Sequence, residues 1–295
     1  MIKDKKLTVE STLPINEKGI LLLDTDKAKE YGQYLSELYT TAEQYPHIVI
    51  DKFLPIWLIE KIHNGFPKEK SNDKYFEENF TGLHKRQILP YWCDENIQNI
   101  FNFFNSSPFI RFLESITKIE SLLGDPHFGG GGFHEIKTGG HLGIHADFKI
   151  QTELHLLRRI NVLIYLNKNW KKEYGGNLEL WDKKMNKKIK SIEPIFNRCV
   201  IFNTDSYSYH GHPDPLNTPD NITRKSIALY YYTASKKIYE DVESYSTMYV
   251  SRPYDRKNIK LKAFKLRVHN YLNDWLPPIG YRFIKNIMRL LRKSY

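Results

Sequence analysis

Two histidine-containing segments of the chain carry side chains suited to binding one metal ion. "HLGIHADF" contains His145 and Asp147, and residues i and i+2 of a β-strand face the same side. An imidazole nitrogen and a carboxylate oxygen can therefore bind one ion together. "YHGHP" offers His210 and His212 about 65 residues further on, and the residue types alone leave open which of them is the third ligand.

A set of two histidines and one carboxylate leaves three coordination positions open and is typical of non-haem Fe(II) oxygenases. The segment "TRKSIALYYYT" adds a feature suited to such a site, because Arg224 and Ser226 share one face of a strand. A guanidinium group binds both oxygens of a carboxylate. A metal-bound 2-oxoacid would turn its far carboxylate toward Arg224, and the phenol of Tyr165 could donate a further hydrogen bond.

Short β-branched or aromatic segments bounded by Gly, Pro and Asn must position these side chains. From about 133 to 234 they follow one another closely, which predicts an antiparallel sandwich or jelly roll. The glycine pair in "KEYGGNLEL" predicts a hairpin turn. The segments before this β-core are expected to be a helix at 25–45, a strand at 45–55, a helix at 55–67, a helical stretch at about 95–123 and a loop at 124–132.

The composition is that of a globular protein, with 295 residues of which 41% are hydrophobic. Neither a signal peptide nor a membrane-spanning helix is expected. Cys93 and Cys199 form no disulfide framework, so a reducing, cytoplasmic location is the expectation. We expect a helical N-terminal extension at 1–44, a catalytic domain at 45–235 and a basic helical C-terminal extension at 236–295.

The net charge of +10 belongs to the C-terminal tail. Residues 252–295 hold twelve Lys or Arg and two acids, while the rest of the chain holds 32 of each sign. Along the last residues of the chain, basic side chains and apolar side chains recur at the spacing of an amphipathic helix. Two interpretations stay open: a helix packed on its own domain, or contact with an anionic membrane or acidic partner. Nucleic-acid binding is not expected, because no stacking pattern accompanies the charge.

The motifs together resemble a known family. His145-x-Asp147, then "YLNKNW" with "GGNLELW", then His210, then Arg224-x-Ser226 follow one another as in the Fe(II)/2-oxoglutarate-dependent oxygenases, most similar to the prolyl-4-hydroxylase-like branch. "YPHIVIDKFLP" resembles the usual opening of that catalytic domain. The resemblance covers about residues 45–235.

The resemblance implies a mainly β fold with flanking helices (α+β) and a double-stranded β-helix (jelly-roll) core. It implies iron binding by His145, Asp147 and His210. It also implies binding of the 2-oxoglutarate C5 carboxylate by Arg224, with Tyr165 and Ser226 assisting. The implied reaction uses O2 to hydroxylate an unactivated C–H bond of a prolyl or other amino-acid-like substrate, small or peptidyl, and releases succinate and CO2. Ascorbate is the expected reductant.

The chain departs from the family pattern in two places. The spacing from His210 to Arg224 is 14 positions, longer than is usual. Near the start of the sheet, where relatives often carry a tyrosine, this chain has His134 and Glu135. His134 is therefore expected to be a pocket residue. His212 is expected to be another, because Pro213 favours an extended backbone that lets His212 share a face with His210. Two alternative functions stay open: a non-catalytic metal-binding sensor or glycan-binding module, and a membrane-associated modifier of glycans or lipids. Desaturation is an alternative outcome to hydroxylation.

Overall fold

The computed structural model describes residues 8–77, 80–151, 154–235 and 247–275. Within these residues one sheet contains 13 strands, and a small hairpin, β2–β3, stands apart from it. The strands are β1 (Thr8–Glu10), β2 (Asn16–Lys18), β3 (Ile20–Leu22), β4 (His47–Asp51), β5 (Gly82–Ile88), β6 (Leu123–Gly124), β7 (Gly132–Ala146), β8 (Ile150–Gln151), β9 (Leu156–Tyr165), β10 (Leu178–Trp181), β11 (Lys188–Ile192), β12 (Cys199–Asn203), β13 (His210–His212), β14 (Arg224–Ala234) and β15 (Met248–Tyr249). The helices are α1 (Thr25–Thr40), α2 (Ile56–Asn64), α3 (Glu95–Phe104), α4 (Ser107–Thr117) and α5 (Lys257–Trp275), with 3-10 turns at Pro90–Trp92 and Lys172–Tyr174.

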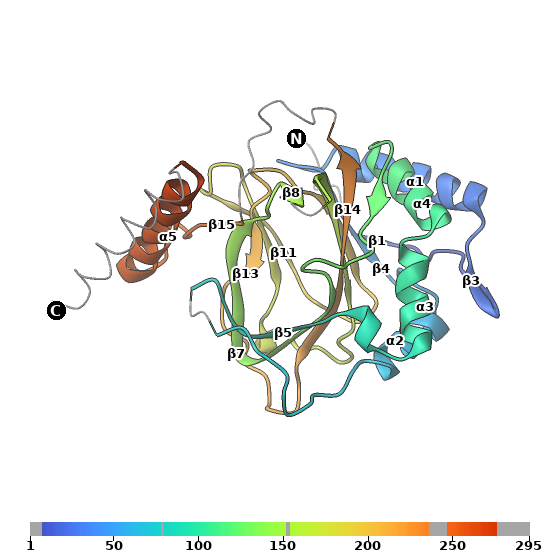
Figure 1. The fold of residues 1–295 in the computed structure, drawn as a ribbon, viewed down its shortest axis with the longest axis horizontal. Coiled ribbons are helices and arrows are strands. Elements are labelled where there is room, and N and C mark those ends of the chain that lie inside the picture. The colour runs from blue at the N-terminus through green and yellow to red at the C-terminus, as the bar shows by residue number, and fades with distance from the viewer. Residues whose placement is uncertain (1–7, 78–79, 152–153, 236–246, 276–295) are drawn as a thin grey trace.

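The large sheet runs in the order β1-β4-β12-β9-β14-β7-β13-β10-β11, and its pairings are antiparallel except for β1 with β4. The long strand β7 joins the two halves of this sheet. Its beginning pairs with β14 and its end pairs with β13, so that the sheet curls back on itself. Figure 1 shows the strands surrounding a common centre, with helices outside them. The expected double-stranded β-helix with flanking helices is confirmed.

Alternation along β9 separates the two sides of the sheet. Ile160, Val162 and Ile164 are fully buried against the helical side and belong to the main hydrophobic core. Asn161 and Leu163 face the inside of the curled sheet, where they line a cavity. Full burial of such an apolar side chain stabilises the fold by roughly 1.5–3 kcal/mol. The strand therefore anchors the helices with one face and supports the site with the other.

The N-terminal segment packs on the same core as the catalytic segment. Helix α1 lies along α4, and the rings of Tyr31 and Phe112 are 5.5 Å apart between centroids. Leu35 and Tyr39 are fully buried in the main core. Figure 1 shows α1 to α4 on one side of the sheet and α5 on the opposite side. Residues 8–44 are thus integrated with the domain that follows them.

The helical stretch expected at about 95–123 is two helices, α3 and α4, rather than one. Pro108 stands in the first turn of α4, where its missing N–H costs nothing, whereas a preceding helical turn would clash with its ring. The chain therefore breaks at Asn105 and Ser106 and starts a new helix. Lys118 ends α4 in a left-handed conformation, and residues 123–124 form strand β6.

The hairpin expected at the glycine pair is wrong. Strand β9 pairs with β12, β14 and β8, whereas β10 pairs with β11 and β13, so Gly175 and Gly176 connect two halves of the sheet. Both glycines have positive φ, +69° and +71°. A Cβ on Gly176 would lie 2.5 Å from the Leu216 side chain and 3.0 Å from that of Arg224. Glycine is required here for close packing rather than for a tight turn.

No helix in the described part of the chain is both long enough and apolar enough to cross a membrane. The basic and apolar helical repeat expected at the end of the chain falls in residues 276–295, outside the described residues.

Candidate metal centre

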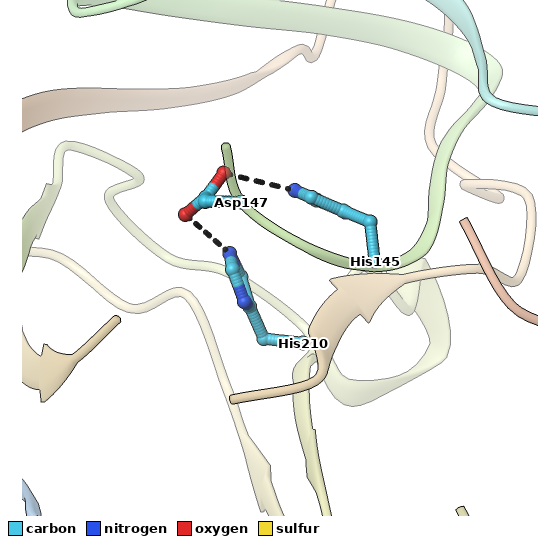
Figure 2. Close-up of side chains that lie close together, drawn as sticks. All are labelled: His145, Asp147 and His210. Carbon is cyan, nitrogen blue, oxygen red and sulfur yellow. Dashed lines mark ion pairs between the residues drawn. The ribbon is translucent and has the colours of Figure 1, made fainter. Parts of the chain in front are cut away.

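Three of the predicted site residues converge at one end of the curled sheet. His145 lies near the end of β7 and Asp147 directly follows that strand, while His210 begins β13 and pairs in register with His145. The Nε2 atom of His145 lies 3.5 Å from Oδ1 of Asp147, and the Nε2 atom of His210 lies 3.5 Å from Oδ2 of the same carboxylate. One ligand atom from each residue falls within 4.8 Å of the others. Figure 2 shows both imidazole rings directed at the carboxylate.

Backbone carbonyls orient the two imidazole rings. The Nδ1 atom of His145 is 2.8 Å from the Gly143 carbonyl oxygen, and that of His210 is 2.9 Å from the Ser208 carbonyl oxygen. Because a carbonyl can only accept, each Nδ1 carries the proton and each Nε2 keeps its lone pair. Burial lowers the pKa of His210 to about 4, so this imidazole is neutral at neutral pH. Neutral imidazoles with free Nε2 lone pairs are what a divalent metal needs.

The Asp147 carboxylate is held by two side chains of β9. The Asn161 amide donates to it at 2.7 Å, and the Arg158 guanidinium lies 3.1 Å away. Burial alone would raise the pKa of Asp147, but Arg158 and the two histidines hold it well below its usual range. Arg158 also donates to Asn161 at 2.8 and 3.1 Å and lies over the Tyr230 ring. The carboxylate is therefore ionised and fixed in position.

Sequence reasoning missed Arg158 and Asn161. The signal available was the run "RRIN", which places polar residues at the start of an otherwise apolar strand. A register shift between Tyr231 and Tyr232 in the β14–β9 pairing displaces Arg158 from the simple alternation. An i, i+2 count from Tyr165 therefore reaches Asn161 but passes over Arg158.

A cavity of about 200 Å³ extends from these residues to the opposite wall. Arg224 and Ser226 of β14 line it, and both are buried. The Arg224 Nε atom donates to the Gly176 carbonyl at 2.8 Å, and its Nη2 atom lies 3.4 Å from the Tyr165 hydroxyl. Tyr165 lies behind Arg224 and does not itself line the cavity. The structure thus places the predicted carboxylate-binding arginine in the same cavity as the candidate metal ligands.

The two predicted pocket histidines also line this cavity. His134 Nε2 lies 2.9 Å from the Gly130 carbonyl. His212 is 3% exposed, and neither of its ring nitrogens has a hydrogen-bond partner among the described residues. Burial holds the pKa of His212 well below its usual range. Glu135 faces away from the cavity and pairs with Arg86 and Lys225.

Comparison with known proteins agrees with this geometry. A sequence model of the 2OG-Fe(II) oxygenase superfamily matches residues 131–232, which hold all the candidate metal ligands and Arg224. Among curated proteins, the prolyl 3-hydroxylase OGFOD1 of Mus musculus is 30% identical over 82 residues. That alignment covers 26% of this chain and 15% of the length of the mouse protein.

Two solved structures resemble the fold. A prolyl-4-hydroxylase from Pseudomonas putida has a TM-score of 0.49 at 14% identity, covering 69% of this chain and 99% of that one. A prolyl hydroxylase from Trichoplax adhaerens, in complex with a hypoxia inducible factor peptide fragment, has a TM-score of 0.46 at 19% identity, covering 70% of this chain and 91% of that one. Residues 131–232 therefore match the 2OG-Fe(II) oxygenase superfamily, the family that the motifs of this chain predicted.

Proposed function

We propose that this protein is an Fe(II)- and 2-oxoglutarate-dependent dioxygenase that hydroxylates an unactivated C–H bond of its substrate. One observation carries the proposal: a converging His-Asp-His set and a buried arginine line the same cavity. The first set suits a divalent metal with open coordination positions, and the second suits the far carboxylate of a 2-oxoacid.

The residues present fit both groups. His145, His210 and Asp147 would hold the metal through their Nε2 atoms and a carboxylate oxygen. The two orphaned nitrogens of the buried His212 indicate that a polar ligand belongs in the cavity, because a buried polar group without a partner is unfavourable. Arg224 would bind the cosubstrate carboxylate, backed by the Tyr165 hydroxyl. Bound iron would supply the activation of O2 coupled to decarboxylation of 2-oxoglutarate to succinate and CO2.

The protein itself contributes positioning. Arg158 and Asn161 fix the Asp147 carboxylate, and the carbonyls of Gly143 and Ser208 fix the imidazole tautomers. Burial of the cavity excludes bulk water and strengthens these interactions. Ascorbate is proposed as the reductant that maintains Fe(II). A prolyl or other amino-acid-like substrate, small or peptidyl, is proposed on the grounds that the mouse relative is a prolyl 3-hydroxylase.

The proposal is tested by measuring succinate formed from 2-oxoglutarate with Fe(II) and ascorbate, together with binding of the metal and of 2-oxoglutarate. We expect metal-dependent binding of 2-oxoglutarate to the wild-type protein. Arg224→Met should keep the metal and weaken 2-oxoglutarate binding at least tenfold, because the buried carboxylate loses its charged partner (about 2–5 kcal/mol). Absence of both metal and 2-oxoglutarate binding would refute the proposal. Binding without any turnover would favour the non-catalytic sensor instead.

A second, separate proposal concerns the basic tail 252–295, for which we propose contact with an anionic membrane surface or acidic partner. Its described part, α5, exposes Phe264 at 63% together with Leu261 and Val268. Lysines such as Lys262 and Lys265 stand beside these apolar groups on the surface. Co-sedimentation of the full chain with anionic vesicles tests the membrane version. The double variant Lys262→Glu, Lys265→Glu should bind the vesicles more weakly than the wild type. Equal co-sedimentation of the two proteins would refute the membrane version of the proposal.

A further inference from the structure

Lys85 is a charged residue at the site for which the described residues provide no partner. It lies on β5, opposite Ile136 of β7, and its side chain lines the cavity that holds the candidate metal ligands. No hydrogen bond or ion pair joins its ammonium group to any described side chain. The other two cations of the cavity differ, since Arg158 pairs with Asp147 and Arg224 contacts Gly176 and Tyr165.

The surroundings of Lys85 are unfavourable for a lone ammonium group. Burial lowers its pKa to about 8; Asp147 opposes this shift, whereas Arg224 and Arg158 add to it. Lys85 is half-buried, so its ammonium group loses part of its hydration, and no described carboxylate pairs with it in return. An anionic ligand would supply that missing partner. Lys85 therefore points to an anion that binds beside it.

The proposed metal and cosubstrate do not supply this neutralisation. Asp147 is the sole carboxylate among the described residues that line the cavity. A divalent metal bound by Asp147 keeps one positive charge, and 2-oxoglutarate brings two negative charges that neutralise this charge and that of Arg224. The charges of Arg158 and Lys85 then remain. The loaded site is still positive, so the third component, the substrate, is the one that can balance it.

A second hollow shows where the substrate would lie. It has a volume of about 400 Å³ and is lined by Lys74, Tyr75, Phe76, Lys85, Gln87, Gly130, Leu142 and Tyr249. Lys85, Gly130, Leu142 and Tyr249 line both hollows, so the two are adjacent. The outer hollow includes neither the candidate metal ligands nor Arg224, and none of its described lining residues is acidic. Its aromatic side chains and lysines suit a molecule with an apolar body and an anionic group.

We infer that the substrate is a small molecule bearing a carboxylate or phosphate group, which enters through the outer hollow and binds Lys85. This inference rests on the proposed function, because it assigns the outer hollow to the substrate of that reaction. Lys85 would fix the distance between the anionic group and the carbon that reacts, and so would select the substrate. A neutral peptidyl proline would leave the lysine unpaired.

The inference is tested with the full chain saturated with 2-oxoglutarate and one equivalent of Zn(II), which is not redox-active. Methyl phosphate and acetate are titrated separately, and binding is followed by phosphorus and proton NMR. We expect the wild type to bind at least one of the two anions. Lys85→Met should weaken that binding about tenfold or more, because the charged partner is lost. Lys85→Arg should retain it within about threefold.

Lys190→Met provides a matched control. Lys190 is also half-buried, and burial likewise lowers its pKa to about 8, but it lines neither hollow. This variant should bind each anion with the affinity that the wild type has for it. Retained Zn(II) binding by each variant shows that it is folded.

The outcomes separate the two levels of the argument. If the wild type binds Zn(II) and 2-oxoglutarate but neither anion, or if Lys85→Met binds them unchanged, the inference is overturned and the proposed function stands. If Lys85→Met instead weakens 2-oxoglutarate binding and spares the anions, Lys85 serves the cosubstrate and the inference is again overturned. If the wild type binds neither Zn(II) nor 2-oxoglutarate, the proposed function itself fails.

Discussion

The two ends of the central cavity differ in how completely the protein satisfies its own polar groups. At the metal end, the imidazoles of His145 and His210 and the carboxylate of Asp147 each have a hydrogen-bond partner in the chain. In the rest of the cavity, neither ring nitrogen of His212 has a hydrogen-bond partner among the described residues, and the Lys85 ammonium group pairs with no described side chain. The metal end is preorganised by the protein, whereas the other end needs ligands to complete it. Substitutions at the two ends should therefore have opposite effects on the stability of the ligand-free protein.

His210→Ala is expected to have the largest effect on metal binding. Loss of one of three protein ligands should weaken Zn(II) or Fe(II) binding on the order of hundredfold or more. The reason is that the free energy of metal binding is large and comes from only a few ligands. His212→Ala serves as the control, since His212 is not among the residues whose ligand atoms converge, and it should leave metal affinity nearly unchanged. Direct titration of the metal-free variants measures both. If the two variants exchange these behaviours, His212 is the ligand.

Acid should destabilise the metal-free protein through the buried histidines. The pKa of His210 is about 4 in the folded state, below the ordinary 6.5 of the unfolded chain. As the pH falls from 6.5 to 4, the unfolded chain takes up a proton that folded His210 does not, so the free energy of unfolding decreases. The decrease is on the order of 3 kcal/mol for this group, and it is absent above pH 6.5. Urea unfolding between pH 7.5 and 4.5 measures it, and an unchanged midpoint would contradict the burial of a neutral His210.

Arg158→Met is expected to weaken metal binding without removing a ligand. The substitution leaves Asp147 buried with a weaker partner, and loss of a group that orients a ligand typically reduces metal affinity about 10–100-fold. Arg198→Met is the matched control, because Arg198 forms a bidentate pair with Asp51, at 2.6 and 2.9 Å, and neither residue lines the cavity. Metal titration should show a loss for the first variant alone. Equal losses would mean that the effect is one of general stability.

Sequence could predict the residues whose roles depend on local spacing. His145 with Asp147, and Arg224 with Ser226, were recognisable because each pair shares one face of one strand. The pairing register between β7 and β13, which sets His210 opposite His145 and His212 opposite Leu142, is not visible in the sequence. Lys85 and Arg158 were missed for the same reason. Their proximity to the site depends on the β5–β7 pairing and on the irregularity in β14–β9.

His212→Leu should have the smallest effect, and its sign is the sharpest test of the difference between the two ends. The leucine removes two buried nitrogens that lack partners, so the ligand-free protein should become more stable by about 1 kcal/mol. The same change removes a polar group from the cavity and should weaken 2-oxoglutarate binding to the metal-loaded protein. Urea unfolding and 2-oxoglutarate titration measure the two effects. His210→Leu is the comparison, and it should destabilise the ligand-free protein. If His212→Leu lowers the free energy of unfolding as much as His210→Leu does, wild-type His212 makes a favourable interaction without any ligand. The two regions would then be equally preorganised.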